Sequence, residues 1–351
     1  MPAASRASTG VPPQRLTGGT GHVDAAGGQD RIVHVGVLHR RLSALYESVL
    51  EGNSSAPSFP RFDAYVEHER SLRGSSRLAS AVAHWDAAAG TWQLPLYGDA
   101  STGSGRTRRV RVRLGAERAA ALRSAAGASP FRALTAQQSQ FQLFATVLLA
   151  WLHRISGEET VAVGTPWHGR SSAAFRDTAG LFVELFALRV TVGADDTFAS
   201  LGAKVASATH DAMRHVVPGA SVSPGARAFG VVLNFITAQL GDFAGAPVRA
   251  DWIHAGYGDR DHRVRVQVHD FDRAGDPVVD FDLDEGAFGE TEREWAVRHF
   301  LTLFEYPLIE GAGTPEGQVP LADLPTLDIS LTDTADTLDP ALALIAEAGL
   351  S

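Results

Sequence analysis

The chain has 351 residues, of which 44% are apolar and 20% charged, a composition typical of a globular protein large enough for two packed lobes. Its net charge of −9 excludes the basic surface that nucleic-acid binding needs, so we expect no nucleic-acid partner. Cysteine is absent, which excludes disulfide bonds, a thiolate nucleophile and cysteine-ligated zinc.

Residues 1–30 are rich in Gly, Ala, Ser, Thr and Pro and contain hardly any large apolar residue, which predicts a disordered leader. They lack the apolar segment of a signal peptide. No apolar run in the chain approaches the roughly 18–20 residues that a membrane-spanning helix needs. We therefore expect a cytoplasmic protein with no membrane span.

The first third of the chain is predicted to be mainly helical. Apolar residues recur at helical spacing over 33–50, and two shorter helices are predicted over 62–72 and 78–89. Residues 107–114 alternate between apolar residues and arginine, which predicts a half-buried strand. A helix over 116–126 follows.

Five arginines lie in this strand or just before it: Arg106, Arg108, Arg109, Arg111 and Arg113. The favoured interpretation is the solvated outer face of a strand. The alternative is a basic strip that docks an acidic carrier protein.

The central part of the chain has the strongest pattern. An apolar stripe at helical spacing predicts a buried helix over 135–154, which Gly157 ends. A short apolar strand over 160–165, a polar loop that contains Arg170 and a second strand that ends at Arg189 follow.

The C-terminal part is predicted to alternate irregularly between helices and strands. The predicted elements are a helix from Asp196 or Thr197 to about His215, strands over 229–236, 264–269 and 277–283, and a helix over 291–304. The last two strands are expected to pair as a hairpin. This order predicts an α+β fold with a mixed sheet rather than a doubly wound one. Residues 311–351 contain no Lys or Arg and are predicted to be an acidic tail.

Histidine spacing predicts no metal site. His210 and His215 are five residues apart, whereas metal-binding pairs on a helix are three or four apart, and no His-Glu-x-x-His motif is present. His254, His262 and His269 flank or lie in a loop and a strand and are predicted to be surface residues.

The central motifs resemble the C-terminal half of the condensation domains of nonribosomal peptide synthetases and their acyltransferase relatives. The family's strand-and-loop motif appears as Val163-Gly164-Thr165-Pro166 with Gly169-Arg170, and its next motif as Ala179 to Val183 leading to Leu188-Arg189. Further segments in the family's order extend the resemblance over about residues 37–304. The residues in these segments resemble slightly more those of the stand-alone acyltransferases associated with polyketides and lipids.

The resemblance implies a fold of two lobes, each like chloramphenicol acetyltransferase, that form a V with a tunnel between them. Residues 31–130 would be the remnant of an incomplete N-terminal lobe, and residues 131–310 the C-terminal acyltransferase-like lobe.

The resemblance also implies a reaction. An acyl group would move from a carrier-protein phosphopantetheine or a CoA thioester, bound as a substrate with no resident cofactor, to the amine or hydroxyl of a small-molecule acceptor in specialised-metabolite biosynthesis. An acyl or peptidyl carrier protein is then the expected partner. The alternative is a non-catalytic module of the same fold that recruits a carrier protein or a tailoring enzyme.

In the family, the reacting groups meet at a His-His-x-x-x-Asp-Gly motif whose second histidine takes the proton or orients the nucleophile. The nearest match here runs from Gly21 to Gly27, with His22 in the place of the second histidine. Gly21 replaces the first histidine and Ala26 the aspartate. His22 is therefore the candidate catalytic base, and an exposed histidine in the leader is the alternative.

Four further residues are carried by the resemblance. Trp167 and Asn234 are candidates for the tunnel lining, with plain packing as the alternative for Trp167 and hydrogen bonding to backbone groups for Asn234. Arg189 is expected to anchor a strand end by hydrogen bonds, and Arg170 to have a structural role, pairing with a carboxylate.

Overall fold

The computed structural model describes residues 30–52, 60–87, 94–97, 103–170, 172–236, 240–271, 275–310 and 320–324. The predicted leader with His22, and the predicted acidic tail apart from 320–324, lie outside the described residues.

Seven α-helices and six strands make up most of the described part of the chain. The helices are α1 (Asp30–Leu50), α2 (Asp63–Leu72), α3 (Ser76–Ala87), α4 (Gly115–Gly127), α5 (Ala136–Ser156), α6 (Phe198–His215) and α7 (Glu290–Glu305). The strands are β1 (Thr107–Arg113), β2 (Thr160–His168), β3 (Val183–Thr191), β4 (Val231–Ile236), β5 (Val264–His269) and β6 (Val278–Asp284). Each lies within a few residues of the element predicted from the sequence.

The six strands form one mixed sheet in the order β1-β6-β5-β4-β2-β3. β4 is parallel to both β5 and β2, whereas the pairs β1–β6, β5–β6 and β2–β3 are antiparallel. The mixed sheet and the β5–β6 pairing confirm the predicted fold class and the predicted hairpin.

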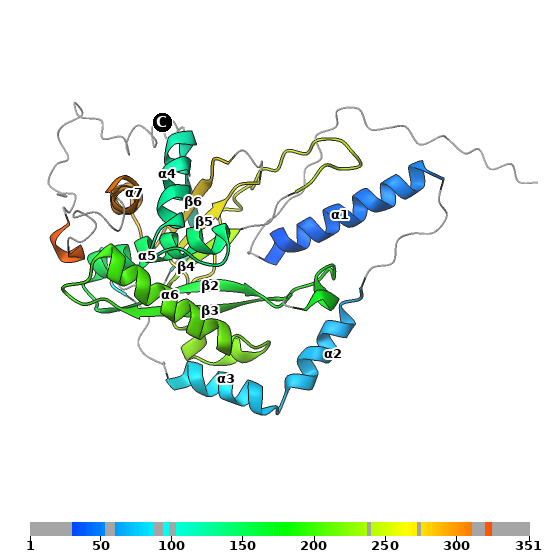
Figure 1. The fold of residues 1–351 in the computed structure, drawn as a ribbon, viewed down its shortest axis with the longest axis horizontal. Helices are drawn as coiled ribbons and strands as arrows, with labels where there is room; N and C mark the ends of the chain where they lie inside the picture. The colour runs from blue at the N-terminus through cyan, green and yellow to red at the C-terminus, as the bar shows by residue number, and fades with distance from the viewer. Residues whose placement is uncertain are drawn as a thin grey trace, which may run out of the picture.

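The main core lies between one face of this sheet and helices α4 to α7 (Figure 1). α5 is its centre, because every residue from Leu143 to Leu152 is buried. The Thr135 side chain accepts a hydrogen bond from the Gln138 N–H and caps the start of α5. Gly157, at φ 73°, takes the left-handed conformation that ends it.

β1 and α4 belong to this same packed body. β1 pairs with β6 along its whole length, and Leu122 of α4 lies in the core with α5. Both elements precede the predicted lobe boundary at residue 130, so the sheet and its core extend to the N-terminal side of that boundary.

The first three helices lie outside the main core. α3 packs through Ala81 and Trp85 against Phe186 of β3 and Ala212 of α6. α1 contacts two loops: His39 and Tyr46 lie against the Phe243 ring, and Arg41 donates a hydrogen bond to the Asp177 carbonyl.

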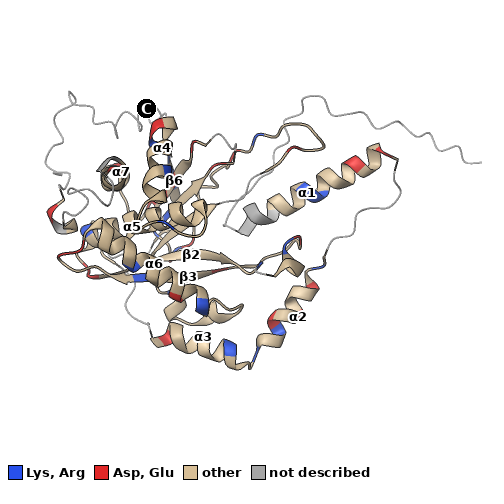
Figure 2. Cartoon of the chain, in the orientation of Figure 1, with Lys and Arg blue, Asp and Glu red and all other residues tan. Residues whose placement is uncertain are grey.

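Charge on these outer helices is of mixed sign. Figure 2 shows Lys and Arg interspersed with Asp and Glu on α1, α2 and α3. Among the described residues, no helix combines the length and the apolar character that crossing a bilayer demands.

The α5 core supplies a direct test of the packing. Replacing Leu149, which is fully buried, by alanine should lower the free energy of unfolding by about 2–5 kcal/mol, because it removes buried apolar area and leaves a cavity. Leu134 is 97% exposed, so Leu134→Ala is the matched control and should change stability by less than about 0.5 kcal/mol. Urea unfolding of both variants measures the difference, and equal losses would contradict the packing described here.

Candidate functional site

The second face of the sheet is polar over four neighbouring strands. Side chains alternate between the two faces of a strand, so Val110 and Val112 of β1 point into the core, and Arg109 and Arg111 point the other way. The same alternation places aspartates of β6, Gln267 and His269 of β5, and Asn234 of β4 on this polar face.

Two arginine–aspartate pairs cross from β1 to β6. Arg109 lies opposite Asp282 and Arg111 opposite Asp280 in the antiparallel register. Nε and Nη2 of Arg109 donate to the two carboxylate oxygens of Asp282 at 2.6 and 2.8 Å. The corresponding distances from Arg111 to Asp280 are 2.7 and 2.9 Å. Both pairs are therefore bidentate, the geometry in which arginine binds a carboxylate most strongly.

These pairs correct the prediction that the arginine strip is a solvated strand face. Only 9% of the Arg109 side chain is exposed, and Asp280 is fully buried. Arg106 and Arg108 do face solvent, where they pair with Glu285. The sequence showed the alternation of β1 but not that the strand beside it carries aspartates at the matching positions.

Asp280 is ionised in this setting. Burial raises the pKa of its carboxyl group, but the hydrogen bond from His269 and the guanidinium groups of Arg111 and Arg109 outweigh burial and lower the pKa to about 2. Nε2 of His269 lies 3.3 Å from the Asp280 carboxylate.

A hydrogen-bond network continues from these pairs across the sheet. The Gln267 amide donates to Asp282, and its carbonyl accepts from Nδ2 of Asn234 at 3.3 Å. Nδ1 of His254 lies 3.4 Å from the same Asp282 carboxylate. Asn234 thus bonds to a neighbouring side chain of the polar face, rather than to the backbone groups named as its alternative role.

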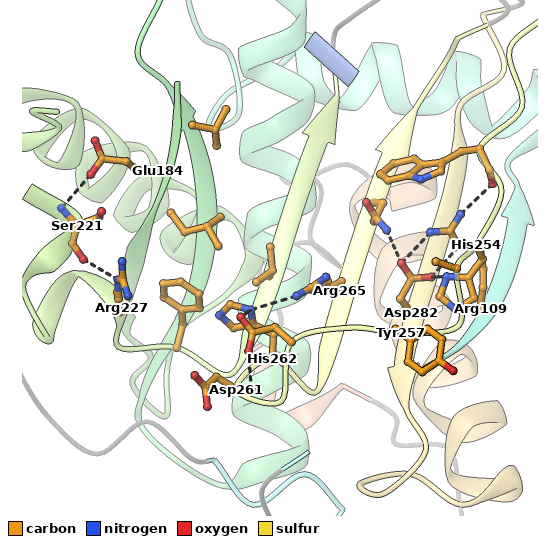
Figure 3. Close-up of a pocket in the computed structure, with 18 of the residues that line it drawn as sticks. Arg109, Glu184, Ser221, Arg227, His254, Tyr257, Asp261, His262, Arg265 and Asp282 are labelled. Atoms are coloured by element: carbon orange, nitrogen blue, oxygen red, sulfur yellow. Dashed lines mark hydrogen bonds and ion pairs between the residues drawn. The ribbon is translucent and has the colours of Figure 1, made fainter. Parts of the chain in front are cut away.

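A pocket of about 440 Å³ opens on this polar face. Its lining comes from strands β1 and β3 to β6, the turn around Ser221 and the segment 252–262 that lies over the sheet. Figure 3 shows the Arg109–Asp282 pair at one side of the pocket and Arg265 and His262 directed toward each other at another. Its volume lies within the range of small-molecule sites.

Arg265 presents a cation to this pocket. Its guanidinium contacts Nδ1 of His262 at 3.5 Å, and among the described residues it forms no ion pair with a carboxylate. Burial lowers the pKa of Arg265, an effect that Asp259 and Asp282 oppose. A half-buried guanidinium that forms no ion pair with a carboxylate is suited to bind an anionic group or a polarised carbonyl oxygen of a ligand.

His262 provides a neutral imidazole beside that cation. It is 9% exposed and stacks on Phe229 with ring centroids 5.1 Å apart. Burial lowers its pKa, with a smaller opposing effect from Asp259, so the ring is neutral near pH 7 and able to accept a proton. The prediction that His262 and His269 are surface residues is wrong, since both are buried.

Gly164 of β2 supports this side of the pocket. The Phe229 ring lies so close to its backbone that a Cβ on residue 164 would come within 2.2 Å of a ring carbon. Glycine at this position therefore leaves room for the Phe229 ring, which stacks on His262.

None of the described residues proposed from the resemblance is among those that line the pocket. His22 is outside the described residues. Trp167 donates from its indole to Oγ1 of Thr165 at 2.8 Å and packs with the cluster between α3 and β3, outside the residues that line the pocket.

Of the two proposed structural arginines, Arg170 lies in the loop that follows β2 and Arg189 lies in β3. Arg170 donates to the carbonyls of Thr178 and Gly180, both at 3.1 Å, and lies over the Phe182 ring, so it joins the loop after β2 to the start of β3. Arg189 lies within β3 opposite Ala162, and burial lowers its pKa.

The pocket residues were not identified as a site from the sequence. A signal existed, because Arg265, Gln267 and His269 alternate with valines along β5 and so had to share one face. What the sequence did not show is that β1 and β6 would bring Arg109 and Asp282 to that same face.

The comparisons with known proteins agree with this architecture. The model of the family described as Condensation domain matches residues 32–219. Phosphinothricin tripeptide synthetase PhsC of Streptomyces viridochromogenes is 29% identical over 191 residues, and malpinin synthetase of Mortierella alpina is 27% identical over 193. These matches cover 51% and 52% of this chain but only 16% and 2% of the relatives.

Solved structures show the same fold. The first condensation domain of the CDA synthetase superposes with a TM-score of 0.63 at 19% identity, over 84% of this chain and 64% of that domain. The condensation domain of the monacolin K polyketide synthase MokA superposes with a TM-score of 0.64 at 16% identity, over 84% of this chain and 69% of that domain. The chain thus spans about two thirds of the structures it resembles.

The low pKa of Asp280 predicts how stability depends on pH. The folded-state pKa of about 2 lies below the ordinary value of 3.8, so this carboxylate stabilises the protein above about pH 4 and the contribution is lost as the pH falls toward 2. The loss should be about 2 kcal/mol. It should be absent in Asp280→Asn and present in Asp251→Asn, which alters an exposed partner of Arg111. Urea unfolding between pH 2 and 7 measures it, and identical profiles for the two variants would contradict the assignment.

Gly164→Ala should lower the free energy of unfolding by about 1–3 kcal/mol, because the new methyl group displaces the Phe229 ring. The double variant Gly164→Ala with Phe229→Ala should cost less than the sum of the two single changes. Gly241→Ala is the control, since a Cβ there meets nothing within 4 Å. Thermal unfolding of the four variants measures the coupling, and strict additivity would rule out the contact.

Proposed function

Because the chain belongs to the condensation-domain family, we propose that its polar sheet face forms one wall of an acyl-transfer site. The acyl group would come from a carrier-protein phosphopantetheine or a CoA thioester and pass to an amine or hydroxyl in specialised-metabolite biosynthesis. The observation that carries the proposal is the pocket in which Arg265 and the neutral His262 lie side by side on this face.

The pocket supplies two of the functions that acyl transfer needs. The acceptor nitrogen or oxygen attacks the thioester carbonyl, the carbon–sulfur bond breaks, and the thiol leaves with a proton. In this proposal Arg265 stabilises the negative charge that develops on the carbonyl oxygen. His262 takes the proton from the acceptor and returns it to the leaving sulfur.

His22 remains a second proposed base, on the strength of its place in the degenerate family motif. Mutation of each histidine distinguishes the two possible bases. Loss of activity on changing His22 would assign catalysis to the family position, and loss on changing His262 would assign it to the pocket. A cytoplasmic location and an acyl or peptidyl carrier protein as partner complete the proposal.

One structural neighbour supports the choice of substrates for a test. A mutant of the starter condensation domain of the rhizomide synthetase RzmA is described in complex with C8-CoA and Leu-SNAC. By analogy, a medium-chain acyl-CoA is a reasonable donor and an aminoacyl thioester a reasonable acceptor for this chain.

A non-catalytic module that recruits a carrier protein is the second candidate. The observation in its favour is that the 351 residues contain no two adjacent histidines, and hence no intact His-His-x-x-x-Asp-Gly motif. It predicts carrier-protein binding without thioester turnover.

The test is release of CoA from octanoyl-CoA in the presence of Leu-SNAC, followed with a thiol reagent. The chain has no cysteine, so the protein itself gives no background in this assay. We expect Arg265→Ala to lower kcat/KM by about 10²–10³-fold and His262→Ala by about 10²–10⁴-fold. Mass spectrometry of the octanoyl-leucyl product confirms that transfer, not hydrolysis, is measured.

His210→Ala is the control, because His210 is exposed on α6 and does not line the pocket. It should keep the activity of the unaltered protein. Carrier-protein binding without CoA release would refute the acyl-transfer proposal in favour of the module. Turnover that survives both pocket changes but not His22→Ala would move the chemistry away from the pocket.

A further inference from the structure

Three side chains with metal-binding chemistry meet where α3 packs on α6. They are His84 of α3 and Asp211 and His215 of α6, and one ligand atom from each lies within 4.8 Å of the others. Asp211 and His215 are four residues apart on the same helix, a spacing at which two side chains share one face. None of the three lines the pocket on the sheet.

We propose that His84, Asp211 and His215 form a binding site for a divalent transition-metal ion, best suited to zinc, that fastens α3 to α6. Two imidazoles and one carboxylate are ligands that zinc takes in proteins, and a water molecule can occupy the fourth position. Because α3 precedes the sheet in sequence and α6 packs on it, the ion would join the N-terminal helices to the main body.

The hydrogen bonding of His215 leaves the correct nitrogen for a metal. Its Nδ1 lies 3.0 Å from the Asp211 carbonyl oxygen, which can only accept a hydrogen bond. In the neutral ring the proton is therefore on Nδ1, and Nε2 carries the free lone pair. Metal-binding histidines commonly have this arrangement, in which a backbone carbonyl orients the ring through its other nitrogen.

The two histidine rings are stacked, with centroids 3.6 Å apart and planes 4° from parallel. Two imidazolium ions would repel each other at this distance. The neutral imidazole is the form that binds metal.

The Asp211 carboxylate has one oxygen available. Arg214 donates a hydrogen bond to Oδ1 at 2.6 Å. Oδ2 instead lies 3.6 Å from Nε2 of His84. The positive charge of Arg214 would repel a bound metal ion. Its side chain is 63% exposed, so it can move into solvent.

The backbone around the site is held by packing independent of any ion. Trp85, next to His84, is buried and donates from its indole to the His215 carbonyl at 3.1 Å. Its ring also lies 5.2 Å from that of Phe186. Zinc bonds of about 2.0–2.1 Å place ligand atoms roughly 3.4 Å apart, so rotations of the three side chains on this fixed backbone would complete the site.

The test is titration of the metal-free full chain with ZnCl₂ near pH 7.5, followed by calorimetry, and with CoCl₂, followed by visible absorption. We expect one ion per chain and a cobalt spectrum of tetrahedral type. His84→Ala and Asp211→Asn should each weaken zinc binding by about 100-fold or more. His210→Ala should bind as the unaltered protein does, because this exposed histidine lies on α6 outside the cluster.

Thermal unfolding adds a readout that does not depend on activity. Zinc should raise the Tm of the unaltered protein and of His210→Ala, as expected for a ligand that binds only the folded state, but not that of His84→Ala. Circular dichroism of the metal-free variants shows whether each is folded. If His84→Ala does not fold, Asp211→Asn replaces it as the test variant. The proposal would be overturned if the unaltered chain bound no zinc, or if His84→Ala and Asp211→Asn bound zinc as tightly as the unaltered chain.

Discussion

The buried arginine–aspartate pairs between β1 and β6 are the interaction on which the rest of the site depends. Removing one partner of such a pair costs several kcal/mol, because the other charge stays buried, whereas replacing both by apolar residues is often neutral or stabilising. Stability alone therefore does not account for Arg109 and Arg111 opposite Asp282 and Asp280. What the pairs do provide is a sheet with two chemically different faces, one sealed by α4 to α7 and the other polar.

The pocket follows from this polar face. Asp282 already accepts hydrogen bonds from Arg109 and Gln267, so the nearby guanidinium of Arg265 is left facing the cavity. On the opposite side, the absence of a side chain at Gly164 lets an aromatic ring lie on the sheet and hold His262. The cation and the neutral imidazole are three residues apart at the start of β5, so their proximity is local. What the rest of the sheet supplies is their surroundings, Phe229 against His262 and the Arg109–Asp282 pair near Arg265.

The sequence predicted local structure well, because local structure depends on local patterns. The stripe that forms α5 and the alternation along β5 are each visible within one segment. Partners across the sheet are not. Arg109 was assigned to solvent because Asp282 lies far along the chain, and His262 was assigned to the surface because nothing near it in sequence indicated the Phe229 ring. The proximity of His84 to Asp211 and His215 is likewise not visible in the sequence, because α3 and α6 are far apart along the chain.

The α3–α6 junction and the pocket are connected through β3. Phe186 of β3 packs against Trp85 beside the proposed metal ligands, and Glu184 of the same strand lines the pocket. The Glu184 carboxylate accepts hydrogen bonds from the backbone N–H groups of Gly219 at 2.8 Å and Ser221 at 3.2 Å. These residues follow closely on the end of α6, whose last residue is His215. An ion that fixes the end of α6 would therefore also fix the turn that forms one rim of the pocket, which makes the helical junction a structural support for the substrate wall.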